Sequence, residues 1–449
     1  MTRNTDPDSL PAFDDSENFS SNMSNNRPFS EVLGASLSRR NVLKGSLATA
    51  GATYLAPSAA FGGHHNGGGE AGPLVDFAPL TTAEVVAAEG KTVTISSDYQ
   101  YQPLIPWGTP IYPGNGVPEY TGDPSTRPTP EEAEQQIGLG HDGMWFFPAN
   151  QARAVRKDMK IYRRIKAKPK FAGFLEKAMG KTRLFNHMGY LCVNHEYGTN
   201  FHVLGKDDPD SLEEVRLSQA IHGVSVVAIR RRGNGEWRLV RSGKNRRITV
   251  NSPMEFSGPA ADSPLLDNVA DNPKLGTMNN CGAGPTPWGT YVTCEENFNG
   301  YFGSNGTFTP TPEQARYGLS SSGFGYGWHL FDDRFDLTNP LYTNECNRFG
   351  WCVEINPFNS NQIPVKRTAM GRFKHESVAF LSEEFDERAV CYMGDDQRGD
   401  YCYKYVSDRP WRDHLLDGES PLDHGTLYVA RFDEGIDGDD GMGTGEWLE

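Results

Sequence analysis

Short apolar runs, rich in β-branched and aromatic residues, recur along the chain and are bounded by Gly, Pro, Asn or Asp. Such runs predict short strands joined by turns. The expected strands cover residues 91–96, 145–147, 191–193, 224–229, 237–240, 290–294, 327–331, 351–355, 389–393, 401–406 and 426–432. Gly233-Asn234-Gly235 between two runs predicts a hairpin. Recurrent short strands favour an all-β propeller or sandwich, although no clean sequence repeat is visible.

Three polar stretches predict helices between these strands. Thr129 before Pro130 and two acidic residues indicates one helix start, and the capping box at 211–214 indicates another. Residues 153–170 carry an apolar stripe, which predicts an amphipathic helix with a solvated basic face. Its cations are Arg153, Arg156, Lys157, Lys160, Arg163, Arg164, Lys166 and Lys168.

The composition narrows the class of protein. The 449 residues include 49 Gly and 30 Pro, which favours strands and turns over long helices. A formal net charge of −15 argues against a nucleic-acid partner. We expect a soluble monomer that acts on small molecules, with bound cations to attract any anionic substrate.

The N-terminus indicates export. Residues 38–44, Ser-Arg-Arg-Asn-Val-Leu-Lys, form a twin-arginine pattern that precedes a weakly apolar run and a small-residue cleavage region. We therefore assign 1–61 to a disordered leader and twin-arginine signal, 62–73 to a flexible Gly-rich linker, and 74–449 to the folded domain. The expected partner during export is the Tat translocase, and the expected location is periplasmic or secreted.

Seven cysteines follow the signal, and an oxidising destination would permit up to three disulfides with one thiol left over. Cys391 and Cys402 flank a predicted hairpin, so they could pair across it. Cys281 is the candidate for the unpaired thiol.

The stretch Asn279–Asn297 gathers the most suggestive chemistry, namely Cys281 and the adjacent acids Glu295 and Glu296. Pro and Gly around the thiol predict an irregular loop, and the acids follow the strand at 290–294. A loop thiol and strand-end carboxylates can converge on a metal. The alternative is a buried thiol beside solvated acids, because successive strand residues point to opposite faces unless the strand ends or bulges.

Two further polar groups occur in a strand-like context, Asn194-His195-Glu196 and Phe373-Lys374-His375-Glu376. His141-Asp142 and Asp395-Asp396 could also be ligands, but residues of a polar turn are the favoured interpretation. If Glu196, Glu295, Glu296 and Glu376 meet, their hard oxygens suit Ca²⁺ or Fe³⁺, whereas a thiolate suits a transition metal.

Ordered motifs over nearly the whole folded region make the chain similar to the PhoX-type alkaline phosphatases. They are the twin-arginine signal, His141–Met144, Asn194–Glu196, His222–Val227, Asn245–Thr249, Asn279–Glu296, Gly350–Ile355, Gly371–Glu376, Gly394–Asp396 and Thr426–Phe432. Residues 153–188 match less well.

This resemblance implies a six-bladed β-propeller with helical and loop insertions. It also implies phosphomonoester hydrolysis at a cluster of iron (Fe³⁺) and calcium (Ca²⁺), with no catalytic residue assigned beyond the cluster. Cys281 would be the iron-bound thiolate and Glu376 an iron-linked carboxylate. Glu295 and Glu296 would hold calcium or bridge metals, and Glu196 would belong to the same cluster.

Members of that family generally continue beyond the point where this chain ends, at Gly445–Glu449, so we expect a propeller that is incomplete at its C-terminus. Two alternatives stay open. One is a phosphodiesterase or phytase-like propeller, and the other is a non-catalytic, calcium-stabilised binding propeller.

Overall fold

The computed structural model describes residues 93–96, 99–114, 116–381, 387–432 and 444–449. Their chain contacts define two compact units. The first contains residues 104–431 and 446–449, and everything below concerns it. The predicted leader, export signal and linker lie outside the described residues.

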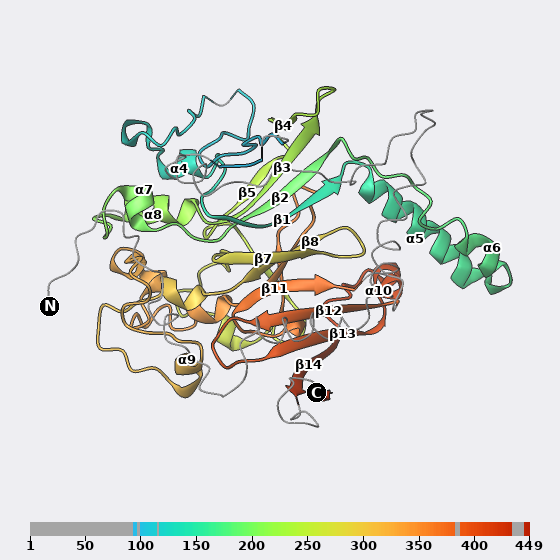
Figure 1. The fold of residues 1–449 in the computed structure, drawn as a ribbon. Coiled ribbons are helices and arrows are strands. Elements are labelled where there is room, and N and C mark those ends of the chain that lie inside the picture. Colours follow the sequence, from blue (N-terminus) through green and yellow to red (C-terminus); the bar gives the residue numbers. More distant parts are fainter. Residues whose placement is uncertain (1–92, 97–98, 115, 382–386, 433–443) are drawn as a thin grey trace, which may run out of the picture. The chain divides into compact units, whose positions relative to one another are not determined.

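Three sheets of five strands each form the framework of the first unit (Figure 1). In the first, β1 to β4 follow chain order and β5 pairs with β3; the strands are β1 (His141–Pro148), β2 (Met188–His195), β3 (Gly223–Arg231), β4 (Trp237–Val240) and β5 (Arg246–Ile248). The second has the order β6 (Glu255–Ser257), β10 (Val365–Arg367), β9 (Cys352–Ile355), β8 (Tyr291–Glu295) and β7 (Asn280–Pro285). The third runs β11 (His375–Phe380), β12 (Arg388–Asp395), β13 (Cys402–Pro410), β14 (Gly425–Phe432) and β15 (Gly445–Leu448).

The three sheets meet along their edge strands. β7 contacts both β1 and β11, so an edge strand of the second sheet lies beside an edge strand of each of the other two (Figure 1). Valines and cysteines of neighbouring sheets fill the space between them. Val226 and Val353 belong to one core cluster, and Val292 and Val378 to another. Full burial of one such side chain stabilises the fold by roughly 1.5–3 kcal/mol. Among the described strands, none of the three sheets closes into a barrel.

Helices fill the connections. They are α4 (Pro130–Ala133), α5 (Gln151–Ala167), α6 (Ala172–Glu176), α7 (Asn200–Leu204), α8 (Leu212–Ala220), α9 (Pro312–Arg316) and α10 (Trp411–Asp417). α4 begins at the predicted Thr129 cap, which also forms a capping box with Glu132. Ser211 caps α8 as predicted, but Glu214 accepts from the N–H of Asp210 and not from that of Ser211. Of the helices in the described ranges, none has both the length and the apolar character that a bilayer span requires.

Most predicted strands are confirmed, and four expectations are wrong. Residues 93–96 form no strand, and 328–330 form a 3₁₀ helix rather than a strand. The Asn280–Pro285 segment pairs with β8, so Cys281 lies on a strand and not in an irregular loop. Cys391 lies opposite Tyr405, so it does not face Cys402, and both thiols are free.

Candidate metal centre

The same irregularity occurs at the start of three edge strands. In β1, β7 and β11 the register gains one residue just after a matched pair. The pairs are His141 with His195, Asn280 with Glu295, and His375 with Asp395. One extra residue on one strand is a β-bulge, which redirects the side chains beside it. In the second sheet the extra residue lies on β7 and not on β8, so the bulge does not turn both Glu295 and Glu296 to the same side.

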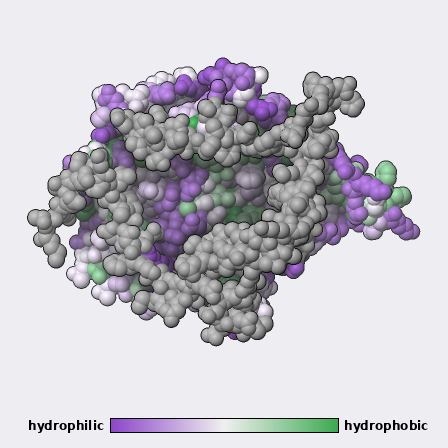
Figure 2. Space-filling model, in the orientation of Figure 1, coloured by the Kyte–Doolittle hydropathy of each residue, from purple (hydrophilic) through white to green (hydrophobic). Residues whose placement is uncertain are grey.

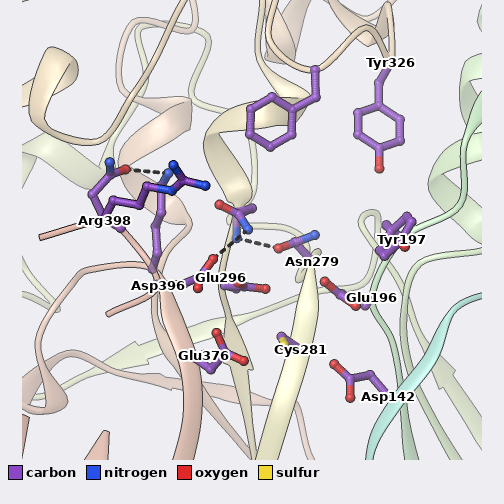
Figure 3. Close-up of a pocket in the computed structure, with 14 residues that line it drawn as sticks. Asp142, Glu196, Tyr197, Asn279, Cys281, Glu296, Tyr326, Glu376, Asp396 and Arg398 are labelled. Carbon is purple, nitrogen blue, oxygen red and sulfur yellow. Dashed lines mark hydrogen bonds between the residues drawn. The ribbon is translucent and has the colours of Figure 1, made fainter. Parts of the chain in front are cut away.

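Each matched pair is followed on both strands by a residue with a ligand atom. The edge strands contribute Asp142, Cys281 and Glu376, and the neighbouring strands end in Glu196, Glu296 and Asp396. One thiol and five carboxyl groups therefore come from equivalent positions of three sheets. Figure 3 shows these six side chains directed into one space.

Small residues allow the three edge strands to approach. A Cβ atom on Gly143 would lie 2.7 Å from the carbonyl oxygen of Cys281, and one on Gly282 would lie 2.5 Å from that of Glu376. Asn194 ties the strands together, since its amide donates to the carbonyls of Cys281 and Gly282. Tyr291 in turn donates to Asn194 Oδ1 at 2.8 Å.

A cavity of about 490 Å³ lies over these strand ends. Its lining is Asp142, Glu196, Tyr197, Asn279, Cys281, Glu296, Asn297, Phe324, Tyr326, Lys374, Glu376, Asp396, Gln397 and Arg398. The six candidate ligands form two groups, in each of which three ligand atoms lie within 4.8 Å of one another. Asp142, Glu196 and Cys281 form one group, and Glu296, Glu376 and Asp396 form the other.

Four of the five residues predicted from the sequence line this cavity, namely Glu196, Cys281, Glu296 and Glu376. Glu295 does not, because its fully buried carboxylate is directed away and is occupied by other partners. One oxygen accepts from Lys366 Nζ at 2.6 Å, and the other accepts from the backbone N–H groups of Gly350 and Trp351 at 2.9 and 3.0 Å. The expectation that Glu295 would hold a metal therefore has no geometric support. Its carboxylate instead forms an ion pair with Lys366 in the interior.

The acidic groups raise one another's pKa values. Burial raises the pKa of Glu196 to about 7, helped by the negative charge of Asp142. Burial raises the pKa of Glu296 to about 10, with a hydrogen bond to Asp396 and the charge of that residue adding to the effect. Burial and the charge of Glu296 also raise the pKa of the Cys281 thiol. The protein alone thus holds these groups in a state in which full ionisation is unfavourable.

The donor set fits multivalent cations. Five carboxyl groups and a thiol share a cavity in which the described cationic side chains are Lys374 and Arg398. Carboxylate oxygens suit Ca²⁺ and ferric iron, and a single thiolate adds a ligand that calcium does not favour. A structural zinc site would instead need several Cys and His side chains.

The histidines next to the site are structural. His195 is fully buried and its Nε2 hydrogen-bonds with Ser225 Oγ at 2.7 Å. His375 stacks on Phe373, with ring centroids 3.6 Å apart. Burial lowers the pKa of both, that of His375 to about 3. They are neutral side chains beneath the cavity.

Two comparisons with known proteins found a match. Residues 77–449 match the family model for alkaline phosphatase PhoX. The chain belongs to the PhoX alkaline phosphatase family. It is also similar to the solved structure of Pseudomonas fluorescens PhoX in complex with vanadate, a transition-state analogue, with a TM-score of 0.65 and 38% sequence identity. That match covers 79% of this chain and 56% of the relative, so the chain spans little more than half the relative's length. No curated protein matches the chain.

Sequence reasoning missed Asp142 and Asp396, which it assigned to turns. For Asp142 this PhoX-family chain does contain a signal. His141-Asp142-Gly143, Asn280-Cys281-Gly282 and His375-Glu376-Ser377 share one pattern of a polar residue, a ligand-type residue and a small residue. The pattern spans only three residues and recurs at unequal intervals, so it can be recognised only after the strands are paired.

Proposed function

We propose that the chain is an alkaline phosphatase that hydrolyses phosphate monoesters at a mixed iron and calcium site. The observation that carries the proposal is the convergence of six ligand-type side chains from equivalent positions of three sheets. Membership of the PhoX family supports it. The relative's complex with vanadate, described as a transition-state analogue, supports phosphoryl transfer as the reaction type.

Asp142, Glu196 and Cys281 would hold one part of the metal cluster, and Glu296, Glu376 and Asp396 the other. When bound, the cations supply positive charge to the phosphoryl oxygens and lower the pKa of water. The raised pKa values of Glu196 and Glu296 mean that metal uptake must displace protons. Metal affinity should therefore increase with pH, in keeping with an alkaline enzyme.

The protein's own cations would orient the substrate. Lys374 and Arg398 both line the cavity on the side of Asp396. Lys374 Nζ donates to Gln397 Oε1 at 2.8 Å, which holds it at the cavity wall. An ammonium and a guanidinium at this place can bind phosphate oxygens, the guanidinium in a bidentate manner. Phe324 offers an apolar wall for the organic part of the ester.

The remaining features of the proposal concern the whole protein. The three sheets would be blades of a six-bladed β-propeller, which their adjacent edge strands support. Residues 74–449 would form this domain, and the twin-arginine pattern supports export by the Tat translocase to the periplasm or beyond. The protein would act as a monomer.

The test is an assay of the purified chain with a chromogenic phosphomonoester and the corresponding diester, before and after chelation. We expect release of phosphate from the monoester, loss of activity with the chelator, and recovery when iron and calcium are returned together. Preference for the diester would instead indicate a phosphodiesterase. A folded, calcium-binding chain without activity on either ester would indicate a binding protein.

A matched pair of cysteine variants sharpens the assay. Cys281→Ser removes the thiol in the cavity, and Cys402→Ser removes an exposed thiol on β13. We expect the first to lose iron and at least about a hundredfold in kcat/KM, which corresponds to about 2.7 kcal/mol of transition-state stabilisation. The second should retain both. Equal activity in the two variants would exclude Cys281 from the site.

A further inference from the structure

A helical hairpin far from the cavity carries an unusual combination of charge and exposed aromatic surface. It consists of α5, the 3₁₀ turn Pro169–Phe171 and α6. In Figure 1, α5 leads away from the end of β1 and carries α6 at its far end. The phosphatase chemistry proposed above uses none of its residues.

One face of α5 is anchored to the protein. Val155 and Met159 pack against the core cluster that contains Trp411. Tyr162 donates a hydrogen bond to Asp413 at 3.0 Å, and Lys166 forms an ion pair with the same carboxylate. These contacts fix the hairpin to α10, so its opposite face is held toward solvent.

The charge of the hairpin opposes that of the protein. Residues 151–183 contain twelve Lys and Arg and two acidic residues, in a chain of net charge −15. All twelve cationic side chains are exposed. Of these twelve side chains, Lys166 alone forms an ion pair with another described residue. Such a concentration of unpaired cations is an electrostatic docking surface for an anionic partner.

The end of the hairpin adds apolar surface to this charge. Phe171 and Phe174 are 61% and 78% exposed, and Leu184 and Phe185 on the returning segment are 43% and 41% exposed. Figure 2 shows apolar surface beside hydrophilic surface at this end of the molecule. Exposed aromatic side chains next to Lys and Arg are typical of segments that enter the boundary between lipid headgroups and acyl chains.

We propose that the α5–α6 hairpin docks the protein on the surface of a bilayer that contains anionic phospholipid. The cations of α5 would meet the headgroups, and Phe171 and Phe174 would enter the interface beneath them. A bilayer matches both features, because an apolar layer lies directly under its charged surface. A nucleic acid would match the cations but offers no apolar layer to the exposed phenylalanines.

The test is co-sedimentation of the full chain with vesicles of phosphatidylcholine alone and with about 30% phosphatidylglycerol added. We expect binding to the anionic vesicles only, with marked weakening as salt rises from about 0.1 M to about 0.5 M. Binding to neither vesicle at low salt would overturn the proposal. So would tighter binding to duplex DNA than to the anionic vesicles.

Two sets of variants locate the surface. Reversal of charge in Arg156→Glu, Lys160→Glu and Arg163→Glu should lower the partition constant at least about tenfold. Phe171→Ser with Phe174→Ser should weaken binding that persists at high salt. A matched control reverses three exposed cations on the β3–β4 hairpin, in Arg230→Glu, Arg232→Glu and Arg241→Glu, and should leave most of the binding intact.

Equal losses of vesicle binding in the hairpin and control variants would overturn the assignment of the docking surface to the hairpin, since the net charge of the protein would then explain binding. Thermal melts and hydrolysis of a soluble phosphomonoester accompany each variant and should match the parent chain. The two proposals are separable, because failure to bind vesicles leaves soluble activity untouched, and an inactive but folded chain can still bind them.

Discussion

Removal of the amine that neutralises Glu295 should destabilise the protein strongly while leaving its metal content unchanged. Lys366 and Glu295 are both fully buried, with their charged atoms 2.6 Å apart. Lys366 Nζ also donates to the carbonyl of Arg348 at 2.6 Å and lies 4.3 Å from the ring centroid of Phe349. The ammonium thus satisfies one carboxylate oxygen and one backbone carbonyl in the interior.

Lys366→Met keeps the approximate volume and removes the charge. The carboxylate of Glu295 would then retain its two backbone donors, Gly350 and Trp351, and the Thr277 side chain, but no positive charge. Loss of one partner from a buried ion pair costs about 3–5 kcal/mol, a large share of the roughly 5–15 kcal/mol that stabilises a typical protein. Glu295→Gln should cost a similar amount, because it leaves a buried ammonium without its counter-charge.

The assay is urea unfolding of the parent, the two single variants and the double variant. Since the double variant contains neither buried charge, its cost should fall below the sum of the single costs by at least about 2 kcal/mol. Additive costs, or a cost below about 1 kcal/mol for Lys366→Met, would refute the reasoning. Iron and calcium per folded chain should stay at the parent level in Glu295→Gln; a drop would restore Glu295 as a ligand.

Two further predictions concern the strand ends. In metal-free protein the carboxyl group of Glu296, with its pKa raised to about 10, keeps its proton when folded and loses it when unfolded. The free energy of unfolding of the parent, relative to that of Glu296→Gln, should therefore fall from about pH 7 to about pH 9, by at most about 1.4 kcal/mol per pH unit. A difference in urea midpoints that stays flat or rises with pH would contradict this. Gly282→Ala places a Cβ 2.5 Å from the carbonyl oxygen of Glu376 and should cost about 1–3 kcal/mol, whereas Gly243→Ala meets nothing within 4 Å and should leave the melting temperature unchanged.

The sequence predicted local elements well where the signal itself was local. The Thr129 and Ser211 caps and the hairpin at 233–235 depend on neighbouring residues, and the structure contains all three. The Gly and Pro residues around Cys281 indicate a loop, but pairing with β8 overrides these turn signals and the segment forms a bulged strand. The strand expected at 327–331 does not form. Gly327 has a positive φ of 67° and begins a 3₁₀ turn instead.

Only part of the site could be predicted from the sequence. Its residues differ in how far their roles depend on tertiary structure. Cys281, Glu296 and Glu376 stand out as unusual residues beside strands. Asp396 looks like any turn residue until β12 is paired with β11. Glu295 and Glu296 are indistinguishable in sequence. In the structure Glu295 ends β8 and meets Lys366 in the interior, whereas Glu296 lines the cavity.

The central claim is that equivalent strand ends of three sheets hold one set of metal ions. The most direct test is elemental analysis of iron and calcium in the purified, folded parent chain and in Asp396→Asn. We expect both metals in the parent and a clear loss in the variant, because Asp396 after a strand of the third sheet and Cys281 on the second would hold the same set of ions. A folded parent that contains neither metal, or an Asp396→Asn variant that retains the full parental content, would contradict it.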